Sequence, residues 1–307
     1  MSSNPPSLPL TRWILKHSGS RKKQQGFTLI ELLIAIVVGS IIIGSLLYLV
    51  VELLGVNARE ERLTQAQQDT RRALDYITRD VREAVYVYST PDAVMGQLND
   101  APAGASPVLA FWRLKPINVA ALPATCPVAQ KEECETLKVR QNVYDLVIYF
   151  HRANDDSNLW SGPRRIIRYE LSNYSNLGNL TPTSGYSDPS KPGNDFAGWE
   201  RGPGNTRGNA VVLTDFIDNH SATVAVACPT GLVPSPANAA TTSNNFFICV
   251  REPDVAGNAL NQSLYMFLRG STATGGVTAV FGPTSQGSSL PTLSTEVQVR
   301  GVVEKNR

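Results

Sequence analysis

Groups that could carry out catalysis are scarce in this chain of 307 residues. It has three histidines, His17, His151 and His220, and no serine or cysteine motif accompanies any of them. The nucleophile elbow, the HExxH zinc motif, the phosphate-binding loop and the dinucleotide fingerprint are all absent. We interpret His151 and His220 as surface histidines. The sequence therefore indicates a protein that is not an enzyme and that needs no cofactor.

Acidic residues are missing from the start of the chain. The first 26 residues contain five of the 28 Lys and Arg residues and none of the 26 Asp and Glu residues. Without this segment 23 basic residues would face 26 acidic ones, and the formal net charge would change from +2 to −3. The basic character therefore belongs to the first segment, and the remainder has no charge pattern that predicts nucleic-acid binding.

Charge and proline are also absent from residues 32–51, a run of 20 residues. An apolar helix of about 20 residues is long enough to cross the hydrocarbon core of a bilayer. The basic segment before it predicts an orientation with the N-terminus inside and the C-terminus outside. A secretory signal peptide would have a shorter apolar region followed by small residues at a cleavage site, which residues 48–54 do not provide. An ordinary single-pass anchor fits the length and the orientation equally well.

Glu31 distinguishes this segment from an ordinary anchor. It is the only charged residue between Phe27 and Val51. A carboxylate one turn inside a membrane helix costs about 2.5–3.5 kcal/mol on insertion scales, so it marks a functional site by default. An anchor has no evident use for such a charge.

The string GFTLIE, from Gly26 to Glu31, follows the basic segment and begins the apolar run. It resembles the prepilin signal of type IV pilins and of the pseudopilins of type II secretion. The resemblance implies that prepilin peptidase cleaves the chain after Gly26 and that Phe27 becomes the N-methylated first residue. It also implies that Glu31 pairs with the free amine of Phe27 in a neighbouring subunit and sets the register between stacked helices.

Small residues within the apolar run indicate close helix packing. Ser40 and Gly44 lie four residues apart, the spacing that lets membrane helices approach each other closely. Glycine is also common in membrane helices in general, so the spacing supports packing within a filament core without establishing it.

The helical pattern continues beyond the apolar run as an amphipathic helix. Apolar or small residues recur every three or four positions, namely Leu63, Ala66, Thr70, Ala73, Ile77, Val81 and Ala84. No proline occurs between Phe27 and Thr90, and Pro91 ends the pattern. This predicts one helix of about 60 residues, about 90 Å long, whose second half packs on a sheet.

The charges of this second half are interpreted mostly as a solvated helix face with pairs such as Asp75 and Arg79. Residues 69–87, DTRRALDYITRDVREAVYV, resemble the end of the helix in the larger minor pilins and pseudopilins, the PilW- and GspJ-like group. The four expected segments are a leader (1–26), a membrane-spanning and filament-core helix (27–54), its amphipathic continuation (55–90) and a β-rich head outside the membrane (91–307).

Beyond Pro91 the sequence reads as strands separated by loops. The candidate strands are rich in β-branched and aromatic residues, and they span 108–114, 144–152, 165–171, 211–217, 223–227, 246–250, 264–269 and 296–302. Helical periodicity is absent there, so a parallel sheet with crossover helices is not expected. The sequence predicts an α+β fold of the pilin type, with a long N-terminal helix on an antiparallel sheet.

Four cysteines, Cys126, Cys134, Cys228 and Cys249, all lie in the predicted outer part. An even number in an exported domain favours disulfides, and three connectivities are possible. We favour the local pairs Cys126–Cys134 and Cys228–Cys249 because loop-like composition flanks each pair. A zinc site is the alternative, but no CxxC motif or nearby histidine supports it, so no metal site is expected.

Three long loops have an unusual composition. Residues 172–209 are rich in Asn, Gly, Pro and Ser, and 231–245 and 270–294 are similar. Four aromatic residues in these loops and in a nearby turn could contact glycan or a partner protein: Trp160, Tyr174, Tyr186 and Trp199. The plainer alternative is that the loops are flexible surface insertions. Residues 154–158 could offer oxygen ligands to calcium, although a strand-connecting turn explains them more simply.

Taken with the family resemblance, these features predict a minor pilin or pseudopilin. The resemblance implies three kinds of partner: prepilin peptidase, other pilins or pseudopilins, and an inner-membrane assembly platform. The pseudopilin that caps the tip typically lacks the glutamate equivalent to Glu31, so this chain is expected beneath the cap. Its size and loops resemble the hormogonium polysaccharide secretion pseudopilins (HpsC-like). The alternative is an anchored glycan- or ligand-binding module that does not polymerise.

Overall fold

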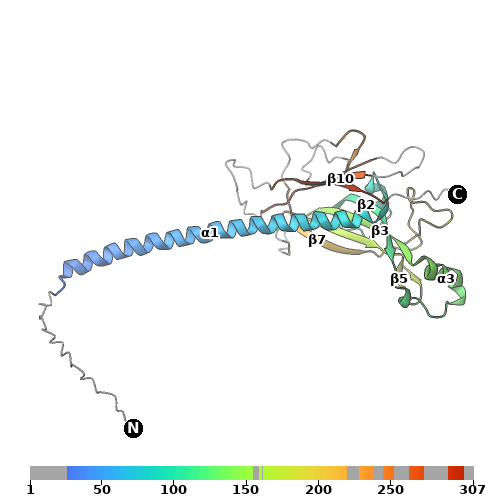
Figure 1. The fold of residues 1–307 in the computed structure, drawn as a ribbon, viewed down its shortest axis with the longest axis horizontal. Helices are drawn as coiled ribbons and strands as arrows, with labels where there is room; N and C mark the ends of the chain where they lie inside the picture. The colour runs from blue at the N-terminus through green and yellow to red at the C-terminus, as the bar shows by residue number, and fades with distance from the viewer. Residues whose placement is uncertain are drawn as a thin grey trace, which may run out of the picture. The chain divides into compact units, whose positions relative to one another are not determined.

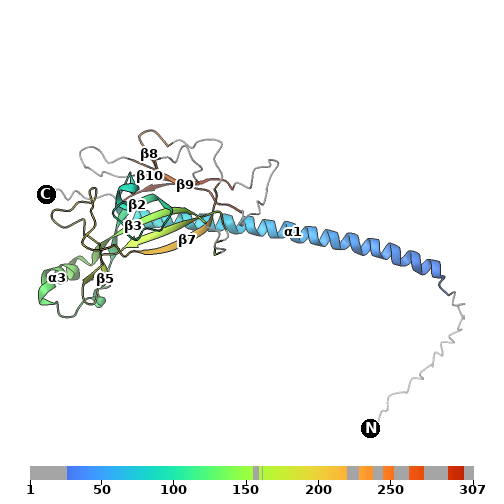
Figure 2. The same ribbon diagram turned by 180° about the vertical axis from the view of Figure 1, so that it is seen from behind.

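The computed structural model describes residues 26–154, 159–160, 162–219, 228–237, 245–251, 263–272 and 290–300. The chain divides into two compact units, Met1–Val56 and Asn57–Arg307. In the described part of the first unit the chain is helical from Leu29 onward, and the second unit contains all the described strands. Figures 1 and 2 show the ribbon from two opposite sides.

Helix α1 spans Leu29–Arg82 and contributes to both units. It is 54 residues long, so the prediction of a helix that continues to Thr90 is wrong at the carboxyl end. Strand β1, Ala84–Val87, follows almost at once. Its valine and tyrosine residues suit a strand, and β1 pairs with β2 (Ala105–Pro116), so that Val87 lies opposite Phe111. Pairing with a distant strand ends the helix there, and the local period could not reveal it.

The larger sheet has five antiparallel strands in the order β1-β2-β3-β4-β7. Its other members are β2 (Ala105–Pro116), β3 (Asn142–Ala153), β4 (Arg164–Leu171) and β7 (Asn209–Ile217). The four strands predicted at 108–114, 144–152, 165–171 and 211–217 lie within these four. We call this the five-stranded sheet.

A second sheet has four antiparallel strands in the order β11-β10-β9-β8. They are β8 (Val233–Ser235), β9 (Phe246–Val250), β10 (Ser263–Leu268) and β11 (Leu293–Gln298). The prediction for β9 is confirmed, and that for β10 differs by one residue at each end. The last strand begins three residues earlier than predicted. The strand predicted at 223–227 lies outside the described residues.

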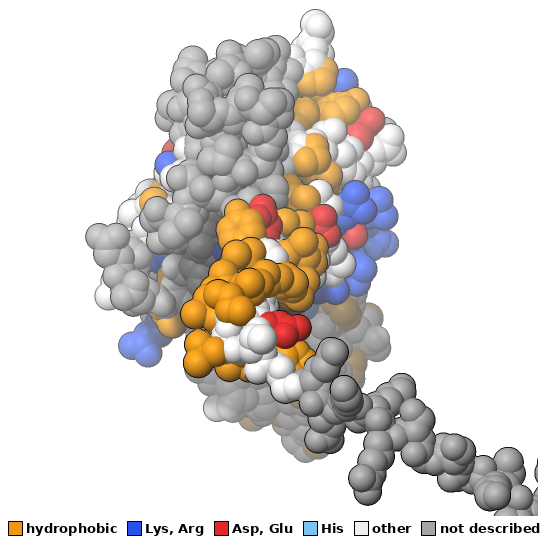
Figure 3. Space-filling view, turned by 90° about the vertical axis from the view of Figure 1, so that its left-hand side faces the viewer, with side chains coloured by type: hydrophobic (Ala, Val, Ile, Leu, Met, Phe, Trp, Pro, Cys, Tyr) orange, Lys and Arg blue, Asp and Glu red, His pale blue; other side chains and the backbone are white. Residues whose placement is uncertain are grey.

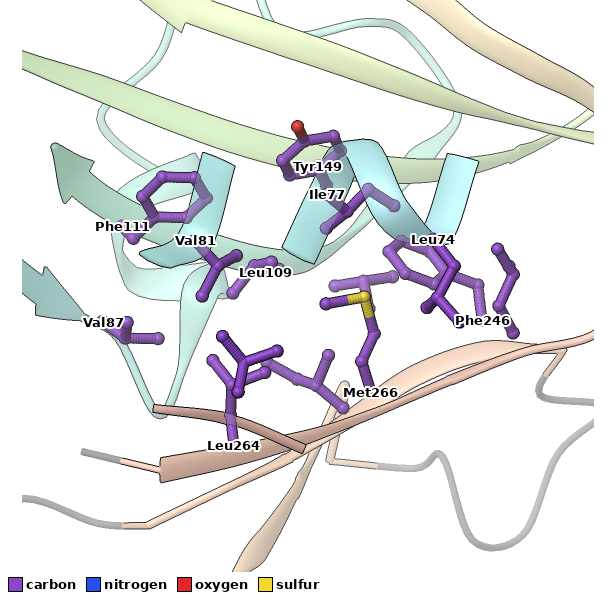
Figure 4. Packing of buried hydrophobic residues seen from close by; sticks show 14 of the residues in the cluster. Leu74, Ile77, Val81, Val87, Leu109, Phe111, Tyr149, Phe246, Leu264 and Met266 are labelled. Carbon is purple, nitrogen blue, oxygen red and sulfur yellow. The ribbon is translucent and has the colours of Figure 1, made fainter. Parts of the chain in front are cut away.

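The second half of α1 lies between these two sheets (Figure 4). Leu74, Ile77 and Val81 of the helix belong to one buried cluster with side chains of both sheets. Those labelled in Figure 4 are Val87, Leu109, Phe111 and Tyr149 from the five-stranded sheet and Phe246, Leu264 and Met266 from the four-stranded sheet. The sequence predicts a single sheet against this half of the helix. That prediction understates the burial of the helix, which is covered on two sides.

The two sheets meet at Gly270, which forms an isolated bridge with Ile217. A Cβ atom at Gly270 would lie 2.2 Å from Oγ1 of Thr70 on α1. The Thr70 hydroxyl donates to the carbonyl of Ala66 at 2.7 Å, so its hydrogen-bond requirement is met inside the helix. Only glycine allows the chain to approach the helix this closely at position 270.

Residues 172–208 cover the other face of the five-stranded sheet, and they include the short pair β5 (Tyr174–Asn176) and β6 (Thr181–Pro182). Tyr186 and Trp199 are 8% and 5% exposed, and their ring centroids lie 6.0 and 5.6 Å from that of Trp112. The prediction that Tyr186 and Trp199 are exposed for glycan contact is therefore wrong. The large apolar rings bury themselves against the sheet because this face would otherwise be uncovered.

Two helices occur beyond the point where the sequence shows no helical period. They are α2, Pro91–Met95, and α3, Lys131–Arg140, with the short turns η1 (Val119–Ala121) and η2 (Val128–Gln130) before α3. Acidic residues occupy the first turn of α3 and basic residues its last, which suits the helix dipole. The interpretation that helical periodicity is absent beyond Pro91 overlooks α3, because this ten-residue helix buries only Cys134 and Leu137 and shows little periodicity. The prediction that no crossover helices join parallel strands is confirmed for the described strands, whose pairs are antiparallel.

Candidate functional site: the N-terminal segment and the head that carries it

Gly26 and Phe27 stand immediately before α1. Phe27 is 81% exposed, and a Cβ atom on Gly26 would meet nothing within 4 Å. Nothing in the described part of the chain therefore requires glycine at position 26. A requirement for glycine there would have to come from another molecule that handles this peptide bond.

Thr28 caps the start of α1. Its Oγ1 accepts a hydrogen bond from the backbone N–H of Glu31 at 3.3 Å, and its carbonyl accepts from the N–H of Leu32 at 3.2 Å. A threonine followed three residues later by glutamate is the capping-box pattern. Glu31 thus lies in the first turn, where the helix dipole favours a negative charge. Sequence reasoning missed the role of Thr28, although this spacing would have indicated it.

No described residue of the chain covers the apolar part of α1. Among the described residues, α1 is the one helix that is long and apolar enough, by length and composition alone, to cross a membrane, and its most apolar stretch is not buried. Figure 3 looks at the molecule from the left-hand side of Figure 1, and hydrophobic side chains cover most of the helix surface in view. Such a surface requires lipid or other helices around it.

Ser40 and Gly44 lie on this uncovered surface. The Ser40 hydroxyl donates to the carbonyl of Val37 at 2.8 Å, so it needs no polar partner from another helix. A Cβ atom on Gly44 would meet nothing within 4 Å. Both positions are therefore free to face a neighbouring helix, and their role in packing stays a prediction.

A buried carboxylate at the end of α1 escapes the sequence reasoning. Asp80 is 7% exposed and accepts hydrogen bonds from Arg113 and Arg168, each at 2.8 Å, and from the Tyr149 hydroxyl at 2.7 Å. The interpretation of the helix charges as mostly solvated holds for Asp75, which is exposed, but not for Asp80. The helical period places Asp80 beside the apolar stripe of α1, which does not decide whether it is buried. The tertiary structure decides it, because Arg113 and Arg168 lie over this side chain.

The same cluster extends across the sheet to Glu170 and Asp145. Lys115 donates to Glu170 at 2.6 Å and lies 2.9 Å from a carboxylate oxygen of the fully buried Asp145. Burial opposes the charged form of Glu170, but hydrogen bonds from Lys115 and Arg168 hold its pKa well below the usual range. Burial raises the pKa of Asp145, and Lys115 only partly offsets this. Three cations and three carboxyl groups thus join the last turn of α1 to the five-stranded sheet.

The four cysteines form two disulfides, Cys126–Cys134 and Cys228–Cys249. These are the local pairs favoured from the sequence. The first ties α3 to the segment before it, and the second ties β9 to the chain that precedes β8. Both lie in the unit that holds the sheets, where they reduce the conformational freedom of the unfolded chain.

The histidine expectations have different outcomes. His151 lies in β3 and is 7% exposed, so its interpretation as a surface histidine is wrong. Burial, and then the positive charge of Arg164, lower its pKa to about 3. His17 and His220 lie outside the described residues. Of the possible calcium ligands, 155–158 also lie outside them, and the Asn154 side chain bonds to Arg165 and to the carbonyl of Gly162.

Comparison with known proteins finds a family match for one part of the chain. Residues 21–47 match the prokaryotic N-terminal methylation motif, which includes Gly26, Phe27 and Glu31. No curated protein and no solved structure matches the chain. With a long apolar N-terminal helix packed against antiparallel sheets, the chain is pilin- or pseudopilin-like, and the motif implies that prepilin peptidase processes it.

Proposed function

We propose that the chain is a minor pilin or pseudopilin. Prepilin peptidase cleaves it after Gly26, Phe27 is N-methylated, and α1 holds the protein in the inner membrane with its C-terminus outside until it enters a filament. The observation that carries this proposal is the methylation motif at residues 21–47. Helix α1 begins within this motif and continues into the core between the two sheets. One helix thereby serves as anchor, as filament core and as part of the head.

Glu31 is the residue proposed to set register. Its side chain is exposed, and no described residue of its own chain pairs with its carboxylate. A carboxylate in an apolar helix is costly without a partner. The amine that cleavage would leave on Phe27 of a neighbouring subunit supplies the opposite charge, and pairing the two fixes the axial offset between helices.

The position in the filament and its cargo follow from resemblance alone. Because it keeps Glu31, we place the subunit near the tip but beneath the capping subunit, and we propose polysaccharide secretion with surface motility as the process it serves. Deletion of the gene should then reduce exported polysaccharide and surface movement together. Loss of protein secretion or of DNA uptake in the deletion strain, with polysaccharide export unchanged, would assign the subunit to another filament system.

The cleavage step has a direct test with a matched control. Gly26→Ala should block maturation, whereas Gly39→Ala, which also adds a methyl group where nothing lies within 4 Å, should leave it intact. Mass spectrometry of the protein from cells with active prepilin peptidase should find N-methylated Phe27 as the first residue. An intact Met1 terminus in those cells would refute the proposal.

The register step needs a variant that is still cleaved. Glu31→Ala should keep processing but reduce incorporation into filaments, because the amine of the neighbour loses its partner. Glu52→Ala removes another exposed acid of the same helix and should assemble normally. If Glu31→Ala and Glu52→Ala assemble equally well in sheared filament fractions, the pairing argument is wrong.

The alternative function is an anchored module that binds glycan or another ligand and does not polymerise. It loses part of its support, since Tyr186 and Trp199 are buried against the sheet. Trp160 and Tyr174 remain partly exposed, and the Arg165 guanidinium stacks 5.3 Å from the Trp160 ring centroid. Unchanged filament number in a deletion strain, with glycan binding lost, would favour this alternative.

A further inference from the structure

A polar cavity opens beside the first residue of β7, at the edge of the five-stranded sheet. Its volume is 480 Å³, and Glu170, Tyr174, Pro182, Arg207 and Asn209 are among the residues that line it. Ligand pockets typically measure about 300–1,000 Å³, and most are lined by apolar side chains. This lining is instead rich in hydroxyl, amide and charged groups, so it suits a ligand that carries many hydroxyl groups.

Arg207 gives the cavity a positive charge that no described residue of the chain neutralises. Its side chain is exposed, and no acid or other described residue pairs with it. Glu170, the acid in the lining, is already matched by Lys115 at 2.6 Å and by Arg113 at 3.1 Å. The planar guanidinium of an arginine binds a carboxylate through two parallel hydrogen bonds. The free charge of the cavity therefore selects a ligand with one carboxylate.

Two rings supply apolar surface next to this charge. The Tyr174 hydroxyl donates to Glu133 at 2.6 Å, which holds the tyrosine side chain in place at the cavity wall. The Pro182 ring lines the same cavity, opposite Tyr174 in the β5–β6 pair. Ring surfaces of this kind accept the C–H face of a sugar, as aromatic rings accept other apolar surfaces.

Neutral hydrogen-bonding groups complete the wall. Ser184 and Asn209 are exposed, and within the described chain their side chains make no hydrogen bond to another residue. A hydroxyl group and an amide offer donors and acceptors at once, which matches the hydroxyl groups of a sugar ring. A phosphate would call for more positive charge than one arginine provides, and an apolar ligand would leave these groups without partners.

We propose that this cavity binds an acidic saccharide unit of the uronic-acid type, with its carboxylate on Arg207 and its ring against Tyr174 and Pro182. This binding lies in the head, and it does not depend on cleavage or on filament assembly. It therefore adds a ligand-binding function to the structural one and can fail or succeed separately from it.

The test compares two sugars that differ at one carbon. D-Glucuronate and D-glucose share their ring, but glucuronate has a carboxylate where glucose has a hydroxymethyl group. Ligand-observed NMR titrations of the full-length protein in detergent micelles should show glucuronate binding at least about tenfold more tightly, as expected for one charge-assisted hydrogen-bonded pair. Arg207→Gln should remove this preference, whereas Arg79→Gln, an exposed arginine outside the lining, should keep it.

Further variants distinguish the sugar from other carboxylates. Tyr174→Phe loses the hydrogen bond to Glu133 but retains the ring, and it should bind glucuronate about fivefold more tightly than Tyr174→Leu, which removes the ring surface. Four results would overturn the proposal: no binding of glucuronate, equal binding of both sugars, an unchanged preference in Arg207→Gln, or binding of N-acetylglycine as tight as that of glucuronate. The last result would assign the cavity to a peptide carboxylate.

Discussion

The stability of the head should fall as the pH falls from 7.5 to 5, and His151 is the reason. This histidine is 7% exposed, and burial followed by the charge of Arg164 lowers its pKa to about 3. Its Nε2 atom is buried and has no hydrogen-bond partner among the described residues. The folded protein therefore keeps the imidazole neutral at a pH where the unfolded chain protonates it.

The size of the effect follows from the two pKa values. An unfolded histidine has a pKa of about 6.5, so below that pH the unfolded state takes up a proton that the folded state refuses. The contribution of His151 is fully present above the unfolded pKa and is lost as the pH falls toward 3. Linkage gives a loss of about 0.8 kcal/mol at pH 6 and about 2 kcal/mol at pH 5, relative to pH 7.5.

Urea unfolding monitored by tryptophan fluorescence measures this loss, because Trp112 and Trp199 are buried and become exposed on unfolding. His151→Gln should flatten the profile between pH 7.5 and 5, whatever its stability at pH 7.5. Glu170 does not titrate in this window, since its pKa is held well below its ordinary value. The raised pKa of Asp145 opposes the histidine effect equally in both proteins. Parallel profiles for the wild type and His151→Gln would refute the reasoning.

Three further changes test the packing of the head by chemical denaturation. Asp80→Asn should cost about 2 kcal/mol, because it removes the buried carboxylate to which the half-buried Arg113 and Arg168 donate, although both arginines keep Glu170, while Asp75→Asn on the exposed face should cost less than about 0.5 kcal/mol; equal costs would contradict the role of the cluster. Gly270→Ala should cost about 1–3 kcal/mol through its clash with Thr70, and a neutral result would show that the helix can move away. Replacing both cysteines of the Cys228–Cys249 disulfide by serine should cost about 3 kcal/mol, and no change under oxidising conditions would show that the bond does not constrain the unfolded chain.

Features that depend on neighbouring residues were predictable from the sequence. The helix from Leu29 onward follows from an apolar run without proline, and four of the five strands of the five-stranded sheet, all but β1, follow from runs of β-branched and aromatic residues. The local disulfides also join residues that are close along the chain. In each case the signal and the structure occupy the same stretch of chain.

Features that depend on distant segments were not predictable in this way. The helix ends at Arg82 because residues 84–87 find a partner strand, and the second sheet covers a side of α1 that the helical period leaves ambiguous. Tyr186 and Trp199 are typical of an exposed loop by composition, yet they pack against Trp112 across the sheet. Whether a residue is buried depends on which distant segments of the chain pack against it.

The sequence by itself determined that this protein is pilin-like at its N-terminus, since Gly26, Phe27 and Glu31 act through their order and through the apolar run that follows. Only the tertiary structure determined which charged side chains form ion pairs inside the head. Asp80 and Asp75 lie on one helix five residues apart, and only Asp80 meets Arg113 and Arg168. The sequence also could not show that Glu170 is paired with Lys115 while Arg207, in the lining of the same cavity, is paired with no described residue. These three residues lie far apart in the sequence, and only folding brings them into one region.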